Sequence, residues 1–128
     1  MTITLTGDPR TKKNSPRIVR RGSFSSILPS VAYTVYEADC SVQLQALRAT
    51  NTGIDYPVNV ACRYYMRTHR KVDLANLLEA TDDILVKNYV LVDDNSNIIA
   101  SHDGSRVDYD KHNPRVEIEI TPIEGAGE

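Results

Sequence analysis

The sequence lacks most of the features that mark secreted, membrane-spanning or disulfide-stabilised proteins. Only two cysteines occur in its 128 residues, Cys40 and Cys62, and their wide separation fits no metal-ligand pattern. We therefore expect two buried free thiols rather than a disulfide framework or a zinc site. No apolar run is long enough to span a bilayer, and the N-terminus lacks the pattern of a signal peptide. These absences predict a cytoplasmic protein with no membrane partner.

A strong net charge is also lacking. The formal charge of −2 would by itself argue against nucleic-acid binding. The basic residues are unevenly distributed, however, and ten of the fifteen fall in two short stretches: Arg10, Lys12, Lys13, Arg17, Arg20 and Arg21 in the first, and Arg63, Arg67, Arg70 and Lys71 in the second. Two interpretations stay open, a surface that contacts phosphate groups and a solubilising loop without a partner.

A balance of 41% hydrophobic and 25% charged residues is that of a globular chain, and the length suits a single domain, residues 1–128. Alternating and helical spacing predict strands over 2–6, 58–68, 98–100, 106–109 and 115–120, and helices over 31–49 and 74–88. Residues 10–30 are predicted to form a long mobile basic loop, and residues 121–128 a frayed tail. This order predicts an α+β fold, a two-layer sandwich with two helices on one face of a small mixed sheet.

Carboxylates concentrate in and just after the second predicted helix. Asp73 stands where an N-cap belongs, and its carboxylate is expected to accept hydrogen bonds from the first turn. Asn76, Glu79 and Asp83 share one polar face, and the turn Asp93-Asp94 follows the helix. The cluster fits a hard divalent cation such as Mg²⁺. It equally fits a solvated helix face followed by an Asx turn.

The segment Asp73-Leu-Ala-Asn76-Leu-Leu, the helix, and then Asp93-Asp94 resemble the core motif of the RusA family of Holliday junction resolvases. Thr11-Lys12-Lys13-Asn14-Ser15 is similar to the N-terminal signature of many phage and Gram-positive members. The resemblance covers roughly residues 2–120. It implies an endodeoxyribonuclease that uses Mg²⁺, or Mn²⁺ in its place, and cuts four-way DNA junctions symmetrically in recombination and repair. It also implies a homodimer in the cytoplasm of a bacterial or phage-infected cell.

The resemblance implies that Asp73 and Asp94 are metal ligands. Ala75 occupies the position of the family's second ligand aspartate, and Glu79 stands where the family often carries a catalytic lysine. We hypothesise that Glu79 supplies the missing oxygen, and that Asp83 and Asp93 are further candidate ligands. The competing hypothesis is a protein that binds metal poorly and binds junctions without cutting them. A small α+β interaction module with no nucleic-acid role is the third interpretation.

Cations near the predicted helix complete the candidate site. Lys71 or Arg70 could stabilise the negative charge that develops in phosphodiester cleavage. His102 and His112 are expected to be solvent-exposed or capping residues rather than metal ligands. The candidate DNA contacts are Lys12, Lys13, Asn14, Arg17, Arg20, Arg21, Arg67, Arg70, Lys71 and Asn76.

Overall fold

The computed structural model describes residues 1–12, 17–22, 24–28 and 30–123. Its two helices are α1 (Val31–Ala46) and α2 (Leu74–Lys87). Its strands are β1 (Thr2–Thr6), β2 (Arg17–Arg21), β3 (Phe24–Leu28), β4 (Val58–Met66), β5 (Ile99–Ser101), β6 (Arg106–Tyr109) and β7 (Arg115–Pro122).

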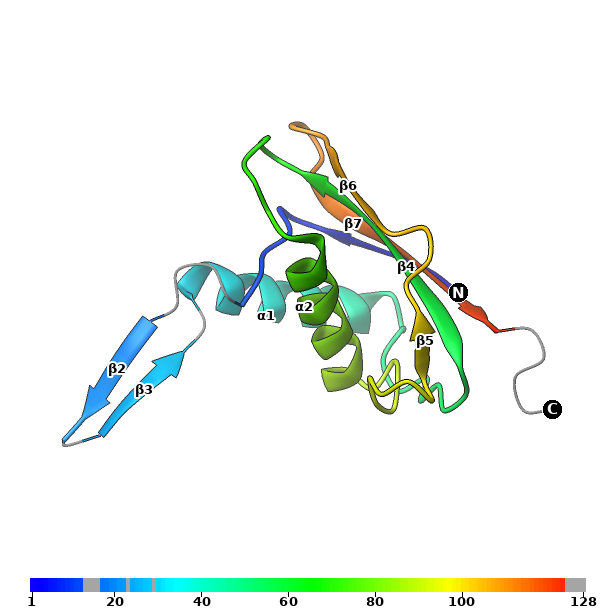
Figure 1. Ribbon diagram of the computed structural model, residues 1–128, viewed down its shortest axis with the longest axis horizontal. Coiled ribbons are helices and arrows are strands. Elements are labelled where there is room, and N and C mark those ends of the chain that lie inside the picture. Colours follow the sequence, from blue (N-terminus) through cyan, green and yellow to red (C-terminus); the bar gives the residue numbers. More distant parts are fainter. Residues whose placement is uncertain (13–16, 23, 29, 124–128) are drawn as a thin grey trace.

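Strands β1, β7, β4 and β5 follow one another across a five-stranded sheet, and β6 also pairs with β4. Pairing is antiparallel between β1 and β7 and between β7 and β4, whereas β5 and β6 run parallel to β4. Both helices cover the same face of this mixed sheet (Figure 1). The structure therefore confirms the predicted α+β fold with two helices on one face.

The core lies between the sheet and the two helices because one side of each element is apolar. Alternate residues of β4, from Val58 to Met66, are buried, as the period-two pattern predicts. In α1 the buried residues Tyr33, Tyr36, Cys40 and Leu44 recur at helical spacing. The helix predicted over 31–49 ends at Ala46, and its C-cap Leu47 is 54% exposed.

Residues 10–30 do not form the predicted continuous loop. Strands β2 and β3 pair antiparallel as a two-stranded hairpin, with Arg17 opposite Leu28 and Arg21 opposite Phe24. The hairpin extends away from the sheet and the helices (Figure 1). The sequence pattern was hidden because serines, a glycine and arginines interrupt the apolar residues that usually mark a strand.

The C-terminal strand is longer than predicted. β7 continues to Pro122, with Thr121 opposite Asn59 and Pro122 opposite Val58, and the Ile123 N–H donates to the carbonyl of Pro57 at 3.1 Å. The frayed tail was predicted over residues 121–128, but residues 121–123 are part of the sheet or bonded to its edge. Residues 124–128 lie outside the described part.

Both thiols are buried and free, as predicted. Burial raises the pKa of Cys40 to about 11 and that of Cys62 to about 12, so both stay protonated at neutral pH. Among the described residues no helix is long and apolar enough to cross a membrane.

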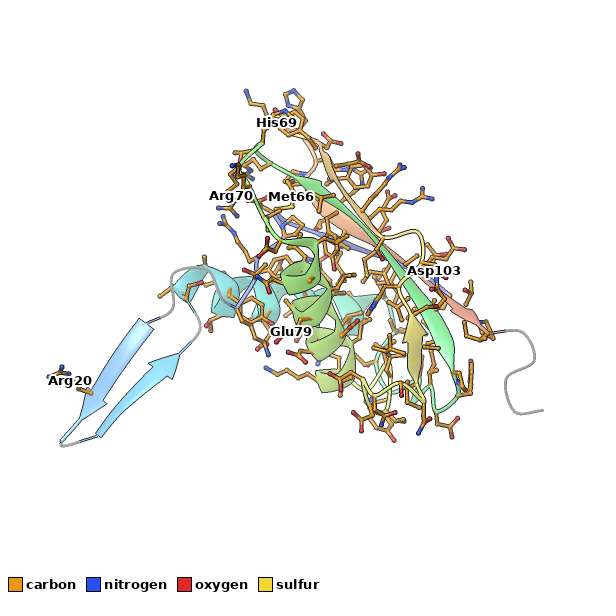
Figure 2. The ribbon with its side chains drawn as sticks, in the orientation of Figure 1. Arg20, Met66, His69, Arg70, Glu79 and Asp103 are labelled. Carbon is orange, nitrogen blue, oxygen red and sulfur yellow. The ribbon has the colours of Figure 1, made fainter. Side chains whose placement is uncertain are left out.

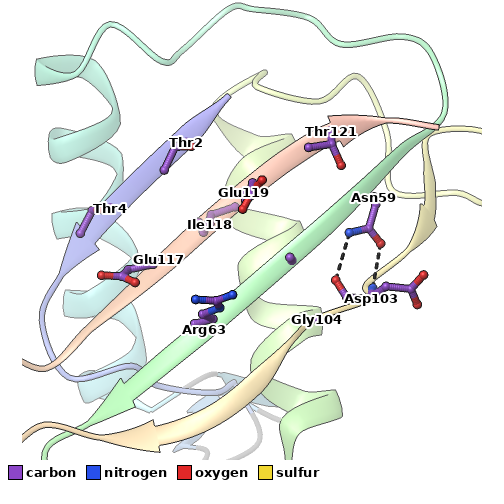
Figure 3. A pocket seen from close by; sticks show the side chains of 11 residues that line it. Thr2, Thr4, Asn59, Arg63, Asp103, Gly104, Glu117, Ile118, Glu119 and Thr121 are labelled. Carbon is purple, nitrogen blue, oxygen red and sulfur yellow. Dashed lines mark hydrogen bonds between the residues drawn. The ribbon is translucent and has the colours of Figure 1, made fainter. Parts of the chain in front are cut away.

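The sheet face away from the helices carries a shallow hollow of about 440 Å³. Figure 3 shows Thr2, Arg63, Glu117 and Glu119 along it, and Asn59 joined to the backbone of Asp103 by two hydrogen bonds of 2.7 and 3.0 Å. Arg63 lies directly opposite Glu117 in the register. This outer face is therefore of mixed charge, which makes it a poor extension of a phosphate-binding surface.

Candidate active site

Asp73 occupies the N-cap position of α2, as predicted, but it does not cap the helix. Its backbone has φ −83° and ψ 122°, and its side chain accepts no hydrogen bond from the backbone N–H groups of the first turn. Instead the Asn76 amide donates to Asp73 Oδ2 at 3.3 Å. The predicted capping bond is therefore wrong. The exposed carboxylate keeps most of its lone pairs for another partner.

The faces of α2 divide largely as predicted. Leu77, Thr81, Ile84 and Leu85 are buried, whereas Glu79 is exposed on the opposite side (Figure 2). Asp83 on that polar face is half-buried and forms an ion pair with Lys12, which joins the first basic stretch to α2. The helix thus presents carboxylates to solvent while its apolar side packs on the sheet.

Asp82 is the acidic residue that sequence reasoning missed. It is only 8% exposed, and both of its oxygens lie within hydrogen-bonding distance of His102 Nε2, at 2.9 and 3.1 Å. Burial raises the pKa of the Asp82 carboxyl, and the bond to His102 opposes this only in part. The same bond raises the pKa of His102. The expectation of a solvent-exposed or capping histidine is wrong, because His102 is half-buried and paired with Asp82. One feature of the sequence could have identified this residue: Asp82 lies three residues before Leu85, on the apolar side of the predicted helix.

Replacing His102 with alanine should lower the free energy of unfolding by about 2 kcal/mol, because Asp82 would stay buried without its partner. His112→Ala is the matched control: His112 is exposed, and its loss should cost less than about 0.5 kcal/mol. Urea denaturation measures both.

The raised pKa of His102 also fixes the sign of a pH dependence. The folded chain holds the proton more tightly, so the advantage of the wild type over His102→Ala should be complete below the ordinary histidine pKa. It should shrink as the pH rises through the raised pKa. Equal stability of the two chains at every pH would contradict this pairing.

Asp93 and Asp94 lie in the segment that follows α2. The Asp94 N–H donates to Asp93 Oδ1 at 2.7 Å, and this bond lowers the pKa of the Asp93 carboxyl. The segment is held at the start of β4, since the Val58 N–H donates to the carbonyl of Ile98 at 2.8 Å. The charge of Asp94 reaches the buried Asp82 and raises its pKa.

Asp73 and Asp94 lie beyond opposite ends of α2. Fourteen helical residues rise about 21 Å, which separates the N-cap from the segment beyond the C-cap. Across the described ranges, no three His, Cys, Asp or Glu side chains are grouped closely enough to hold a metal ion. The structure brings Asp83 to Lys12 and Asp82 to His102, but it does not gather the five predicted ligands.

The two basic stretches do come together. Asp8, two residues after β1, accepts from the Arg67 N–H at 3.0 Å and pairs with Arg10 at 3.4 Å and Arg70 at 4.0 Å. This carboxylate ties the start of the first stretch to the segment between β4 and α2, whose Arg70 and His69 lie at one end of the sheet (Figure 2). The exposed Lys71 immediately precedes the α2 entry.

Residues 7–121 match the sequence profile of the family described as Endodeoxyribonuclease RusA. The chain belongs to the RusA family of endodeoxyribonucleases. The match spans both basic stretches, α2 and the segment that carries Asp93 and Asp94. No curated protein sequence matches the chain.

Because the chain belongs to the RusA family, its two departures from the family motif bear directly on the metal site. Ala75 is exposed in the first turn of α2, so no carboxylate stands two residues after Asp73. Glu79 is exposed one turn further along. Glu79 and Asp83 are four residues apart and are neighbours on the polar face, as the hypothesis of a substitute ligand requires.

The predicted DNA contacts are described only in part. Lys13 and Asn14 lie outside the described residues. Arg20 is exposed on the hairpin, away from α2 (Figure 2), and Arg17 and Arg21 contribute backbone to β2. Of the predicted DNA contacts, the structure describes the surroundings of Lys12, Arg67, Arg70, Lys71 and Asn76.

Proposed function

We propose that the protein is a Mg²⁺-dependent endodeoxyribonuclease that resolves four-way DNA junctions by symmetric phosphodiester cleavage, in recombination or repair. The observation that carries the proposal is the Asp73 carboxylate. It is exposed at the N-terminus of α2, and its only hydrogen bond with another described residue comes from Asn76. Arg67 and Lys71 stand close by in sequence, and neither forms an ion pair within the described ranges. Metal-dependent cleavage of DNA needs a carboxylate that can bind a cation and basic side chains that can bind phosphate, and Asp73, Arg67 and Lys71 meet these needs.

The carboxylates fit Mg²⁺ better than a softer metal. Mg²⁺ is usually held by one or two protein carboxylates, and water and phosphate oxygens complete its shell. Asp73 and Asp94 would hold the ion, and Glu79, with Asp83 or Asp93, would replace the oxygen lost at Ala75. An ion held by these carboxylates would supply a lowered pKa for an attacking water and positive charge beside the phosphate.

The remaining residues position and neutralise the DNA. Lys71, two residues before Asp73, would stabilise the negative charge that develops on the phosphate. Arg67 and Arg70 would bind the backbone of an adjacent arm. Asn76 holds the Asp73 carboxylate through its amide, which fixes the direction in which the free oxygen points.

A homodimer is part of the proposal. A four-way junction has two equivalent strands to cut, and two sites related by a twofold axis cut them symmetrically. The geometry of α2 adds a reason, since Asp73 and Asp94 stand near opposite ends of a helix about 21 Å long. In such a dimer Asp94 of one copy would approach Asp73 of the other, and each ion would be held between the two copies.

Ala75 favours a second candidate function, a branched-DNA-binding protein of the same scaffold that does not cut. That function needs the basic surface but not the carboxylates. The two candidates share DNA binding and differ in the effect of Mg²⁺.

Binding should respond to salt if phosphate contacts dominate. The affinity for a four-way junction in EDTA should fall at least about tenfold between roughly 50 and 200 mM salt. The double variant Arg67→Gln, Lys71→Gln should reduce that salt dependence. Lys87→Gln is the matched control, because Lys87 is already paired with Glu37 at 2.6 Å at the far end of α2. A chain that retains no DNA at low salt would instead support the interaction module.

A further inference from the structure

The rings of His69 and Tyr109 stack at the end of the sheet where β4 and β6 finish. Their centroids are 3.7 Å apart and their planes differ by 25°. Tyr109 is the last residue of β6 and lies opposite Met66, the last residue of β4. His69 follows in the segment that leads to α2 (Figure 2). Tyr109 remains 42% exposed and His69 is also exposed, so the pair presents aromatic surface to solvent.

Two hollows border this stack. One of about 490 Å³ is lined by Arg67, Thr68, His69, Tyr109 and Lys111, and one of about 310 Å³ shares Thr68, His69 and Tyr109 with it. The first combines flat aromatic surface with two cationic side chains. A ligand with a planar ring and a negative group would be complementary to both.

The cationic side chains of this hollow are not ion-paired within the described ranges. Neither Arg67 nor Lys111 forms an ion pair with any residue that the structure describes. The neighbouring carboxylates are already engaged, since Asp110 pairs with Arg115 and Asp108 with Arg106, each at 2.9 Å. The surface is therefore positive around the stack.

We propose that the His69–Tyr109 stack is a platform for an unpaired base of the DNA substrate, with Arg67 and Lys111 on the phosphates that flank it. The proposal rests on the proposed function, because DNA is the partner that supplies both groups. Base pairs at a branch point are the ones most readily unstacked, and an exposed aromatic pair offers the base a new stacking surface. The platform lies at the end of β4 from which the chain runs to Asp73, so the held base would belong to the strands near the cleavage site.

The test uses the full chain in EDTA with two probes of the same sequence, a four-way junction carrying 2-aminopurine at the branch point and a linear duplex. The variant is Tyr109→Ala. Tyr56→Ala is the matched control, since Tyr56 is 47% exposed and stands before β4, at the other end of the sheet. Tyr109→Phe keeps an aromatic face and should restore the behaviour of the wild type. Circular dichroism confirms folding, and His69→Ala provides the same test if Tyr109→Ala does not fold.

The platform predicts that Tyr109→Ala binds the junction about tenfold more weakly, binds the duplex as before, and no longer changes the 2-aminopurine fluorescence. Wild-type affinity and fluorescence in Tyr109→Ala would overturn the platform and leave the proposed function intact. An equal loss on junction and duplex would also overturn it, since the contact would then not concern an unpaired base. Failure of the wild-type chain to bind the junction at all would contradict the proposed function, and the platform with it.

Discussion

Replacing Asp73 with asparagine is expected to lower Mg²⁺-dependent nicking of a four-way junction at least about 100-fold, because the amide cannot supply the charged oxygen that a hard cation needs. Asp94→Asn should have an effect of the same size. Binding of the junction in EDTA should be retained or slightly strengthened, since one negative charge facing DNA is removed in each case. Initial rates of nicking under single-turnover conditions measure the loss.

Asp55→Asn is the control for this pair, because Asp55 is exposed and lies before β4, near the segment that carries Asp94. Its rate should match that of the wild type. Glu79→Gln then decides between the two hypotheses for the missing ligand: an unchanged rate removes Glu79 from the mechanism. Nicking by Asp73→Asn at the wild-type rate would contradict the proposed metal site.

Mixing two inactive chains should restore activity if each site is shared between copies. A dimer of one Asp73→Asn chain and one Asp94→Asn chain contains one site with both substitutions and one site with neither. Random mixing gives half of the dimers this composition, so about a quarter of the wild-type nicking activity should return. The physical reason is the length of α2, which separates Asp73 from Asp94 within a single chain.

Mixtures of each variant with itself provide the background. A single nick per junction is the expected product of the mixed dimer, because only one of its two sites works. If the mixture stays as inactive as either variant alone, each site is built from one chain, and residues 88–98 would have to rearrange around DNA to bring Asp94 toward Asp73.

The sequence predicted α2 well because its periodicity, its N-cap position and its polar face all agree. The buried stripe around Leu77 and Ile84 and the exposed Glu79 follow directly from a spacing of 3.6 residues per turn. The same rule failed at Asp82, since charged residues are expected outside the core and the partner His102 belongs to a distant turn. No local pattern reports a hydrogen bond between segments that are far apart in the chain.

The candidate site was predictable in composition but not in arrangement. Carboxylates at helical and turn spacing indicated a possible metal site, yet spacing along the chain cannot show that Asp73 and Asp94 flank a helix. The stacking of His69 on Tyr109 could not be predicted from the sequence either, because it depends on the parallel pairing of β4 with β6. The hairpin of β2 and β3 was missed because its composition resembles that of a loop.

Cleavage of a synthetic four-way junction by the wild-type chain, with and without Mg²⁺, tests the central claim most directly. The account predicts paired symmetric nicks that need Mg²⁺, disappear in Asp94→Asn and do not occur on a linear duplex of the same sequence. Junction binding without nicks, together with cleavage gained in Ala75→Asp, would contradict it. That result would show a RusA scaffold that recognises branched DNA but has lost its chemistry at the position of Ala75.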